Sequence, residues 1–297
     1  MNNNKGITIT LIAAVMWGFS GTCSQYIFNN FDADPAYLTA ARLLISGTIL
    51  ILTGFISGKK EMKTILMNKS DRLQLLAFAV FGLMFNQFTY MKAIYYTNSG
   101  TATVLQYIGP VFVMIVSCFL KKKLPQKKEV LAIFMVIAGT FIIATHGNIH
   151  SMVINPTGLF WGIVAAVALM LYTMIPESIT VKYGAIPVTG YGMFAGGVVL
   201  SLLSGLWNAP IIHDTGCLYA FLVIIIFGTI IPFTMYIKGI GLCGPVKASL
   251  VSSIEPVSAT VFMVIWLKES FAFMDFIGFA CIMTTVFLLV NKEKSQN

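Results

Sequence analysis

Long apolar runs alternate with short polar stretches along this chain of 297 residues. A run of about 20 mostly apolar residues can cross a bilayer as a helix. Non-helical backbone is not stable facing lipid, so such runs predict helices. Ten runs are long enough and predict an all-α polytopic membrane protein with ten transmembrane helices. The expected spans are residues 7–28, 36–56, 73–92, 99–119, 127–145, 157–176, 188–206, 215–237, 245–267 and 272–291.

Composition and charge placement support this interpretation. Hydrophobic residue types make up 57% of the chain and charged types only 10%, whereas about 25% is usual in soluble domains. The net charge of +8 comes mainly from basic clusters between spans, above all in residues 59–72 and 121–128. Basic residues on one set of loops indicate the cytoplasmic side. We therefore expect a protein of the cytoplasmic membrane with both termini in the cytoplasm, and we do not expect nucleic-acid binding.

The chain contains an internal repeat. Residues 81–111 align without a gap to residues 227–257 at an offset of 146, and nine of the 31 positions are identical. The identical positions include the pair Pro110 and Pro256, which is harder to explain by shared hydrophobicity than an aliphatic match. Such self-similarity predicts that the architecture is built from duplicated units.

The repeat divides the chain into two units of five expected helices, residues 1–151 and 152–297. Because five is odd, the second unit must enter the membrane from the opposite side. This predicts two inverted-topology five-helix repeats. Secondary transporters are often built in this way, with the substrate site near the midplane between the repeats.

The sequence also resembles a known family. The segments "AAVMWGFSGT" (13–22) and "PAYLTAARLLISG" (35–47), together with two proline-centred helices and the five-plus-five repeat, are similar to the EamA branch of the drug/metabolite transporter superfamily. The resemblance covers nearly the whole chain. It implies a transporter, in most members an exporter of amino acids or other small metabolites, with a small-molecule substrate and the lipid bilayer as partners.

Glu255 is the first candidate site residue. It follows Pro245 by ten residues in the ninth span, which places it about 15 Å deep at 1.5 Å per residue. Ionisable groups at this depth are costly and usually face a water-filled path. Its repeat mate is Gly109, so the carboxyl group is not part of the shared architecture. A purely structural buried acid is the alternative.

Arg42 is the second candidate, about 10 Å from the outer surface in the second span. Two roles remain open at this point. Arg42 could pair with Glu255, or it could bind a substrate carboxylate while Glu255 carries a proton or meets an amine. Snorkelling of Arg42 to the lipid headgroups is a further alternative.

Other polar and aromatic residues are expected to line the substrate and coupling-ion pathway. Each could instead pack or hydrogen-bond between helices. These candidates are Trp17, Asn86, Tyr90, Gln106, Tyr107 and Ser252. Pro110 and Pro256 remove backbone hydrogen bonds and are expected to kink the fourth and ninth helices.

The leading hypothesis is a secondary active transporter that exports amino acids or related metabolites by alternating access. A facilitator or exchanger of another small metabolite is the alternative. An intramembrane enzyme is disfavoured, because the chain has no H-E-x-x-H or G-x-S-x-G motif. We expect no cofactor and no metal, and a proton as the candidate coupling ion. The sequence does not choose between a monomer and a homodimer.

Overall fold

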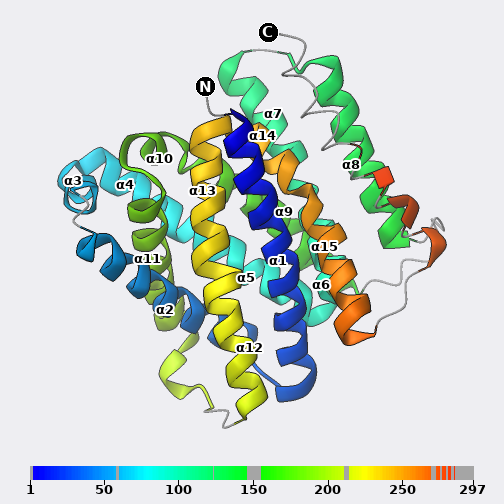
Figure 1. Cartoon of the computed structure of the whole chain (residues 1–297), viewed down its shortest axis with the longest axis horizontal. Helices are drawn as coiled ribbons and strands as arrows, with labels where there is room; N and C mark the ends of the chain where they lie inside the picture. The colour runs from blue at the N-terminus through cyan, green and yellow to red at the C-terminus, as the bar shows by residue number, and fades with distance from the viewer. Residues whose placement is uncertain are drawn as a thin grey trace.

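The computed structural model describes residues 3–57, 60–122, 124–145, 155–210, 214–268, 272–274, 276–278, 280–281 and 284. All regular elements in these residues are helical (Figure 1). Eight helical spans are long and apolar enough to cross a membrane, and they coincide with eight of the expected spans. They are Asn3–Phe31, Pro35–Ile56, Lys69–Tyr96, Ser99–Leu120, Pro156–Tyr183, Ala185–Ser204, Thr215–Cys243 and Pro245–Leu267.

A further helix, α8 (Lys127–Thr145), coincides with the expected fifth span. The expected tenth span, residues 272–291, lies largely outside the described residues. Ten helices therefore stay a prediction.

Most spans consist of more than one helical element. The first two are the single helices α1 (Asn3–Phe31) and α2 (Pro35–Ile56). They are followed by α3 (Glu61–Met67), α4 (Lys69–Ala77), η1 (Phe78–Met84), α5 (Phe85–Tyr96), α6 (Ser99–Gln106) and α7 (Gly109–Lys121). After α8 come α9 (Pro156–Met174), α10 (Glu177–Tyr183), α11 (Ala185–Ser204), η2 (Leu206–Asn208), α12 (Thr215–Ile225), η3 (Ile226–Ile230), α13 (Ile231–Cys243), α14 (Pro245–Val251), η4 (Ser252–Ile254), α15 (Glu255–Phe262) and η5 (Met263–Leu267).

Residues 60–72, which connect two of the expected spans, contain the short helix α3. Met62 and Ile65 of α3 are fully buried, so the segment is packed against the bundle. The Asn68 side chain then accepts a hydrogen bond from the Ser70 amide and begins α4. Asparagine is a preferred N-cap residue, which explains why a new helix begins here.

Four spans are interrupted at repeat-related positions. π-helical turns lie at η1, within Lys69–Tyr96, and at η3, within Thr215–Cys243. Gly82 and Gly228, which are paired in the sequence repeat, fall within these turns. A turn at residues 107–108 separates α6 from α7, and the 3₁₀ turn η4 separates α14 from α15. These last two breaks directly precede the helices whose first turns contain Pro110 and Pro256. Proline fits a first helical turn because it has no amide hydrogen to donate there.

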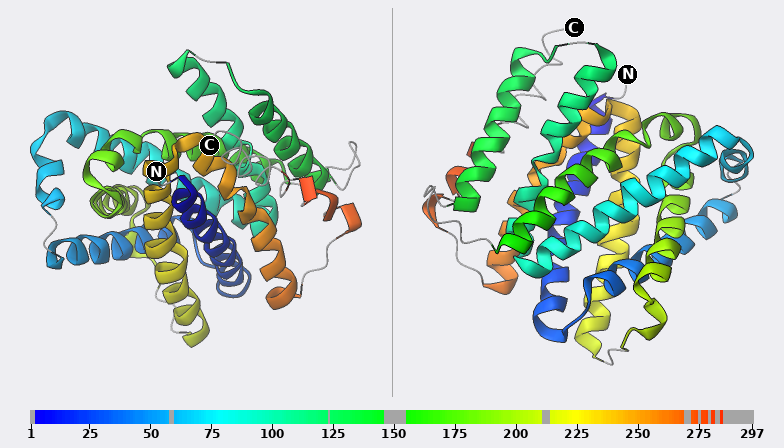
Figure 2. Two further views of the ribbon diagram at one scale, coloured as in Figure 1. Left: turned by 45° about the horizontal axis from the view of Figure 1, so that its top comes forward. Right: turned by 180° about the vertical axis from the view of Figure 1, so that it is seen from behind.

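The helices up to α8 form the first part of the chain, and those from α9 onward form the second part. The two parts interleave, as the views in Figures 1 and 2 show. Helix α1 packs against α13 and α15, whereas α9 packs against α5, α6 and α7. Each part thus places its first span against the third and fourth spans of the other part. Helix α2 packs along α11, the corresponding helix of the second part.

The contact between α2 and α11 is close and reciprocal. A Cβ atom on Gly47 would lie 2.3 Å from the backbone nitrogen of Phe194, and one on Gly197 would lie 2.7 Å from the backbone nitrogen of Leu44. No side chain fits at either position. Glycines therefore let the two helix backbones touch, as small residues do between membrane helices. This contact positions Arg42, which lies five residues before Gly47 on α2.

Candidate functional site

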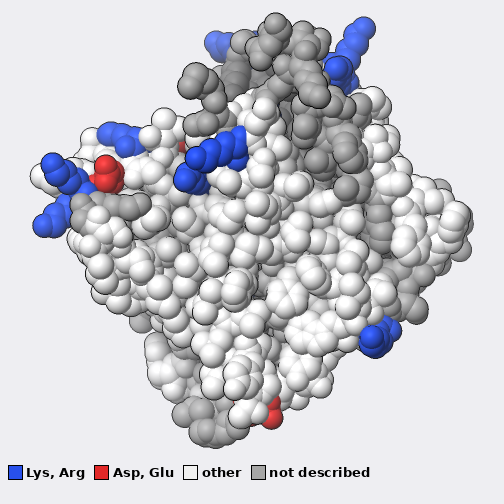
Figure 3. Space-filling model, in the orientation of Figure 1, with Lys and Arg blue, Asp and Glu red and all other residues white. Residues whose placement is uncertain are grey.

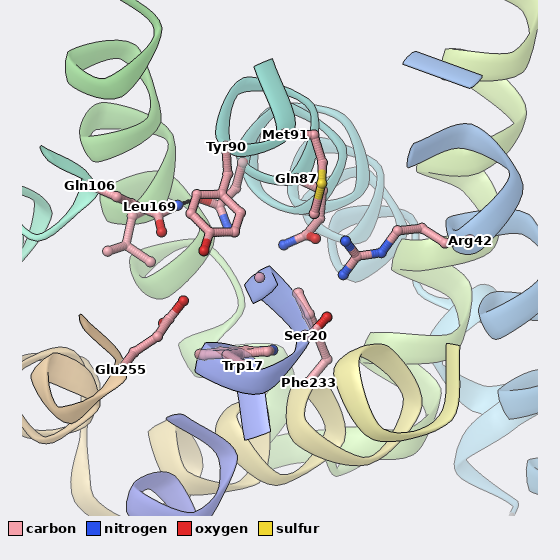
Figure 4. Close-up of a pocket in the computed structure, with 12 residues that line it drawn as sticks. Trp17, Ser20, Arg42, Gln87, Tyr90, Met91, Gln106, Leu169, Phe233 and Glu255 are labelled. Carbon is pink, nitrogen blue, oxygen red and sulfur yellow. Dashed lines mark hydrogen bonds between the residues drawn. The ribbon is translucent and has the colours of Figure 1, made fainter. Parts of the chain in front are cut away.

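A cavity lies at the centre of the bundle, between the interrupted spans (Figure 4). It holds about 370 Å³ of empty space, in narrow gaps between the side chains. Both parts of the chain contribute to its wall. The lining residues are Trp17, Ser20, Gly21, Arg42, Asn86, Gln87, Tyr90, Met91, Gln106, Leu169, Phe233 and Glu255.

Arg42 enters the cavity from α2 and is only 2% exposed. Its Nε atom donates to the Thr229 hydroxyl at 3.2 Å, and that hydroxyl donates to the Ile224 carbonyl group at 2.7 Å. The acceptor lies five residues earlier because this turn is π-helical. The Nη1 atom of Arg42 is buried without a hydrogen-bond partner. The guanidinium is thus held by one edge and has a free donor.

Glu255 reaches the cavity from α15 on the other side, facing Tyr90 (Figure 4). It is 5% exposed. Its Oε2 atom is 2.9 Å from the Tyr107 hydroxyl, which also donates to the Ser252 carbonyl group. Among the described residues, no ion pair joins Glu255 to Arg42, which enters from the far side of the cavity. The two ionisable side chains frame the cavity without a direct contact between them.

Amide side chains form the wall between these ends. Gln106 Nε2 donates to Asn86 Oδ1 at 2.9 Å, which ties α6 to α5. The Tyr90 hydroxyl bonds the Thr103 hydroxyl at 2.7 Å. Gln87 is 4% exposed, and its Oε1 atom is buried without a partner. Since buried polar atoms are normally satisfied, this free acceptor is available to a bound molecule.

An aromatic cluster closes the cavity opposite the amides. Trp17 of α1 packs against Phe233 and Tyr236 of α13, with ring centroids 4.9 Å apart in each case. Tyr172 of α9 stacks on Tyr236 at 5.5 Å. The indole Nε1 atom of Trp17 is buried and has no acceptor. The cluster therefore combines a flat apolar surface with one further free donor.

Six of the candidates from the sequence line the cavity: Trp17, Arg42, Asn86, Tyr90, Gln106 and Glu255. Tyr107 and Ser252 do not line it, but they contact Glu255 or its hydrogen-bond partner from behind. The sequence offered no reason to select Thr229, because a single threonine in an apolar helix is common. The described residues contain no group of three or more His, Cys, Asp or Glu side chains that could hold a metal ion.

A profile of the EamA-like transporter family matches residues 4–145 and again residues 156–291. These two matches cover most of the chain. The chain belongs to the EamA-like transporter family. Its resemblance to this family at the sequence level is thereby confirmed, as is the expectation of a multi-pass membrane protein with apolar helices.

Relatives of this EamA-like chain are also transporters by name. The inner membrane transporter YicL of Salmonella typhimurium is 36% identical over 288 residues, which cover 97% of this chain and 96% of that protein. The transporter YetK of Bacillus subtilis is 24% identical and covers 89% of this chain and 81% of its own length. The riboflavin transporter ImpX of Fusobacterium nucleatum is 27% identical over 146 residues, which span 48% of this chain and 47% of ImpX.

A solved crystal structure of a protein with no stated function has the same fold as this EamA-like chain. The TM-score is 0.77 at 18% sequence identity, and the match covers 99% of each chain. At this identity the likeness concerns the fold alone. The family and the names of the relatives indicate a transporter rather than an enzyme.

Proposed function

We propose that this EamA-like protein is a secondary active transporter that exports amino acids or related small metabolites by alternating access. One observation carries the proposal: the central cavity has a free guanidinium donor on Arg42 at one end and the Glu255 carboxyl group at the other. Buried charges in a membrane are expensive and mark functional pathways. A cavity between two repeats is where transporters of this kind bind substrate.

The free polar atoms indicate how a substrate would lie. Arg42 Nη1 is the donor for a substrate carboxylate, because guanidinium–carboxylate bonds are charge-assisted and strong. Gln87 Oε1 is a free acceptor for an N–H group. Trp17 offers its ring as a flat surface. An amino acid presents these same groups, an anionic end and an N–H donor, on a compact frame. The narrow gaps require the cavity to widen when substrate enters.

Matched features of the two parts support inverted repeats of residues 1–151 and 152–297 within a ten-helix protein. The π turns η1 and η3 occupy equivalent positions in the sequence repeat, as do the breaks before Pro110 and Pro256. The contacts between helices are also reciprocal: the first span of each part packs on the third and fourth spans of the other part. A pseudo-two-fold axis in the membrane plane relates such repeats.

Charge placement supports an orientation with both termini in the cytoplasm. Most basic side chains visible in Figure 3 lie toward the end of the molecule that holds the N-terminus and α3. Basic loops remain on the cytoplasmic side during insertion. A fluorescent protein that matures only in the cytoplasm, fused to either terminus, should therefore fluoresce. A dark C-terminal fusion beside a bright N-terminal one would contradict the ten-helix count.

The decisive experiment measures transport in proteoliposomes. Purified protein is reconstituted and tested with labelled amino acids, amines lacking the carboxylate, and riboflavin as the substrate that one relative carries by name. We expect amino-acid flux that Glu255→Gln reduces at least tenfold. Accumulation against a gradient supports active export, whereas flux that only follows the gradient indicates the facilitator or exchanger alternative. Absence of flux for every carboxylate-bearing compound would refute the proposed substrate class.

A further inference from the structure

Pro256 leaves the Ser252 carbonyl group without its normal helical donor. In an α-helix this oxygen would accept from the amide of residue 256, four positions later. Proline has no amide hydrogen, so the helix forms the 3₁₀ turn η4 instead, in which the Glu255 amide donates to Ser252. The Tyr107 hydroxyl supplies a second donor to the same oxygen. A side chain of the first repeat thus completes the broken ninth span.

Tyr107 has one hydroxyl proton and two contacts that could use it. The Ser252 carbonyl group can only accept, so this contact uses the proton. The second contact, 2.9 Å from Glu255 Oε2, then places two acceptors side by side if Glu255 is a carboxylate. A neutral Glu255 removes the conflict, because its own O–H donates to the Tyr107 oxygen.

Tyr90 gives the same result by a separate chain of hydrogen bonds. The Thr103 hydroxyl donates to the Ser99 carbonyl group at 2.5 Å, which uses the only proton of Thr103. Tyr90 must therefore donate its own proton to Thr103 across their 2.7 Å contact. Tyr90 also faces Glu255 in the cavity, and it has no proton left to offer a carboxylate.

The other ionisable groups around Glu255 do not change this proton count. Tyr172 of α9 and Tyr236 of α13 stack on each other in the aromatic cluster beside the cavity, and a phenol carries no formal charge. Tyr236 bonds Thr173, at 3.1 Å. Among the residues that line the cavity, the basic side chain is Arg42, on the side opposite Glu255. Helix α1, which packs against α15, lines the cavity with Trp17, Ser20 and Gly21, and none of these three ionises.

We propose that Glu255 is the proton-binding group of the transporter and is protonated in the conformation described here, and that Tyr107 holds it neutral by committing its own proton to Ser252. This rests on the proposed function for its role in transport, although the protonation itself is testable without substrate. Tyr107 is a positioning residue, since it acts through Glu255 and does not line the cavity.

The position of Tyr107 links proton release to a conformational change. Beyond it, α7 and α14 pack through Met114 and Leu250, and a cleft with about 730 Å³ of empty space opens between the same helices. Separating α7 from α14 would part Tyr107 from Ser252 and admit water to Glu255. The carboxyl O–H bond then breaks, the proton passes to water, and the electron pair stays on the carboxylate.

The test is infrared difference spectroscopy of the full-length protein in liposomes during a pH titration. Near neutral pH, wild type should show the C=O stretch of a protonated carboxyl group, and Glu255→Gln should lose it. Glu177→Gln, which changes a more exposed carboxyl group, is the matched control and should keep the band. A band that persists in Glu255→Gln, or no such band in wild type near neutral pH, would overturn the proposal.

The role of Tyr107 is tested with Tyr107→Phe, which should shift the pH midpoint of the carboxyl band in a direction that depends on that role. If Tyr107 accepts a hydrogen bond from protonated Glu255, loss of the Tyr107 hydroxyl should lower the titration midpoint of the band by about one pH unit, the worth of one hydrogen bond. A rise in the midpoint would mean that Tyr107 donates to a carboxylate, and it would refute the proposal. Tyr191→Phe removes a similar tyrosine–carbonyl bond, to Met62 at 2.9 Å, and should leave the midpoint unchanged.

A transport assay distinguishes an error in the proton-binding proposal from an error in the proposed function. In proteoliposomes loaded with a pH-sensitive dye and labelled amino acids, wild type should exchange protons for substrate. Glu255→Gln should lose pH-driven accumulation. A titrating Glu255 band without any amino-acid flux would contradict the proposed substrate class alone. Amino-acid flux that is the same at all imposed pH gradients would contradict proton binding as the coupling step.

Discussion

The Arg42 guanidinium and the Glu255 carboxyl group enter one cavity from opposite sides and do not pair with each other. Arg42 is held by Thr229, and Glu255 by Tyr107, so each has a separate anchor. This arrangement favours the second of the two roles that the sequence left open, in which Arg42 meets the substrate. We therefore expect substitutions at Arg42 and at its anchor to act on substrate binding.

Arg42→Gln should raise the KM for a carboxylate-bearing substrate about 10- to 100-fold, because a hydrogen bond to a charged group contributes about 1.5–3 kcal/mol. Concentration-dependent uptake into proteoliposomes measures this. The same variant should change little for an amine substrate that lacks the carboxylate. An equal rise in KM for both compounds would indicate a structural role for Arg42.

Thr229→Val should raise the KM for a carboxylate-bearing substrate up to about tenfold, because the lost hydrogen bond from Arg42 Nε is worth roughly 0.5–1.5 kcal/mol. Thr229→Ser keeps the hydroxyl and should restore the wild-type value. If the serine variant behaves like the valine variant, the methyl group and not the hydroxyl positions Arg42.

Gly47→Val should destabilise the protein by at least about 1–3 kcal/mol, the usual cost of overpacking. The added atoms would meet the backbone of Phe194, which cannot move aside like a flexible side chain. Thermal unfolding in detergent measures the loss. Thr48→Val, which places the same side chain at an exposed position next along α2, should unfold near the wild-type temperature.

Asp71 bridges the two parts of the chain near the start of α4. It accepts hydrogen bonds from Lys182 Nζ and from the Tyr183 hydroxyl, both at 2.5 Å. Lys182 is 52% exposed, so the ion pair should add no more than about 1 kcal/mol to stability. Asp71→Asn is therefore expected to shift thermal unfolding only slightly.

A covalent link at this position should have a larger effect on transport. A short bifunctional thiol reagent joining Asp71→Cys to Lys182→Cys should stop flux if the two parts must separate there, and the single-cysteine variants should keep it. Continued flux in the cross-linked protein would argue against movement at this contact. This experiment tests whether the two parts of the chain move relative to each other during alternating access, and it does not test substrate binding.

The sequence determined the spans closely wherever the structure describes them, because membrane insertion depends on local hydropathy and length. The expected span 36–56 differs from α2 (Pro35–Ile56) by one residue. The expected span 73–92 was too short, because polar residues such as Asp71 continue the helix beyond the apolar run. The expected kinks at Pro110 and Pro256 stay a prediction; the two prolines lie in the first turns of α7 and α15, where their lack of an amide hydrogen is tolerated.

Only the tertiary structure decided which side chains meet. Depth along a helix can be counted from the sequence, but rotation about its axis depends on the neighbours against which it packs. This is why Arg42 and Glu255, although both were predicted to lie inside the membrane, enter the cavity from sides that the sequence did not indicate. It is also why Thr229 was missed and why Tyr107 lies behind Glu255 rather than in the cavity. The sequence identified the ionisable groups, and packing between the two parts of the chain assigned their partners.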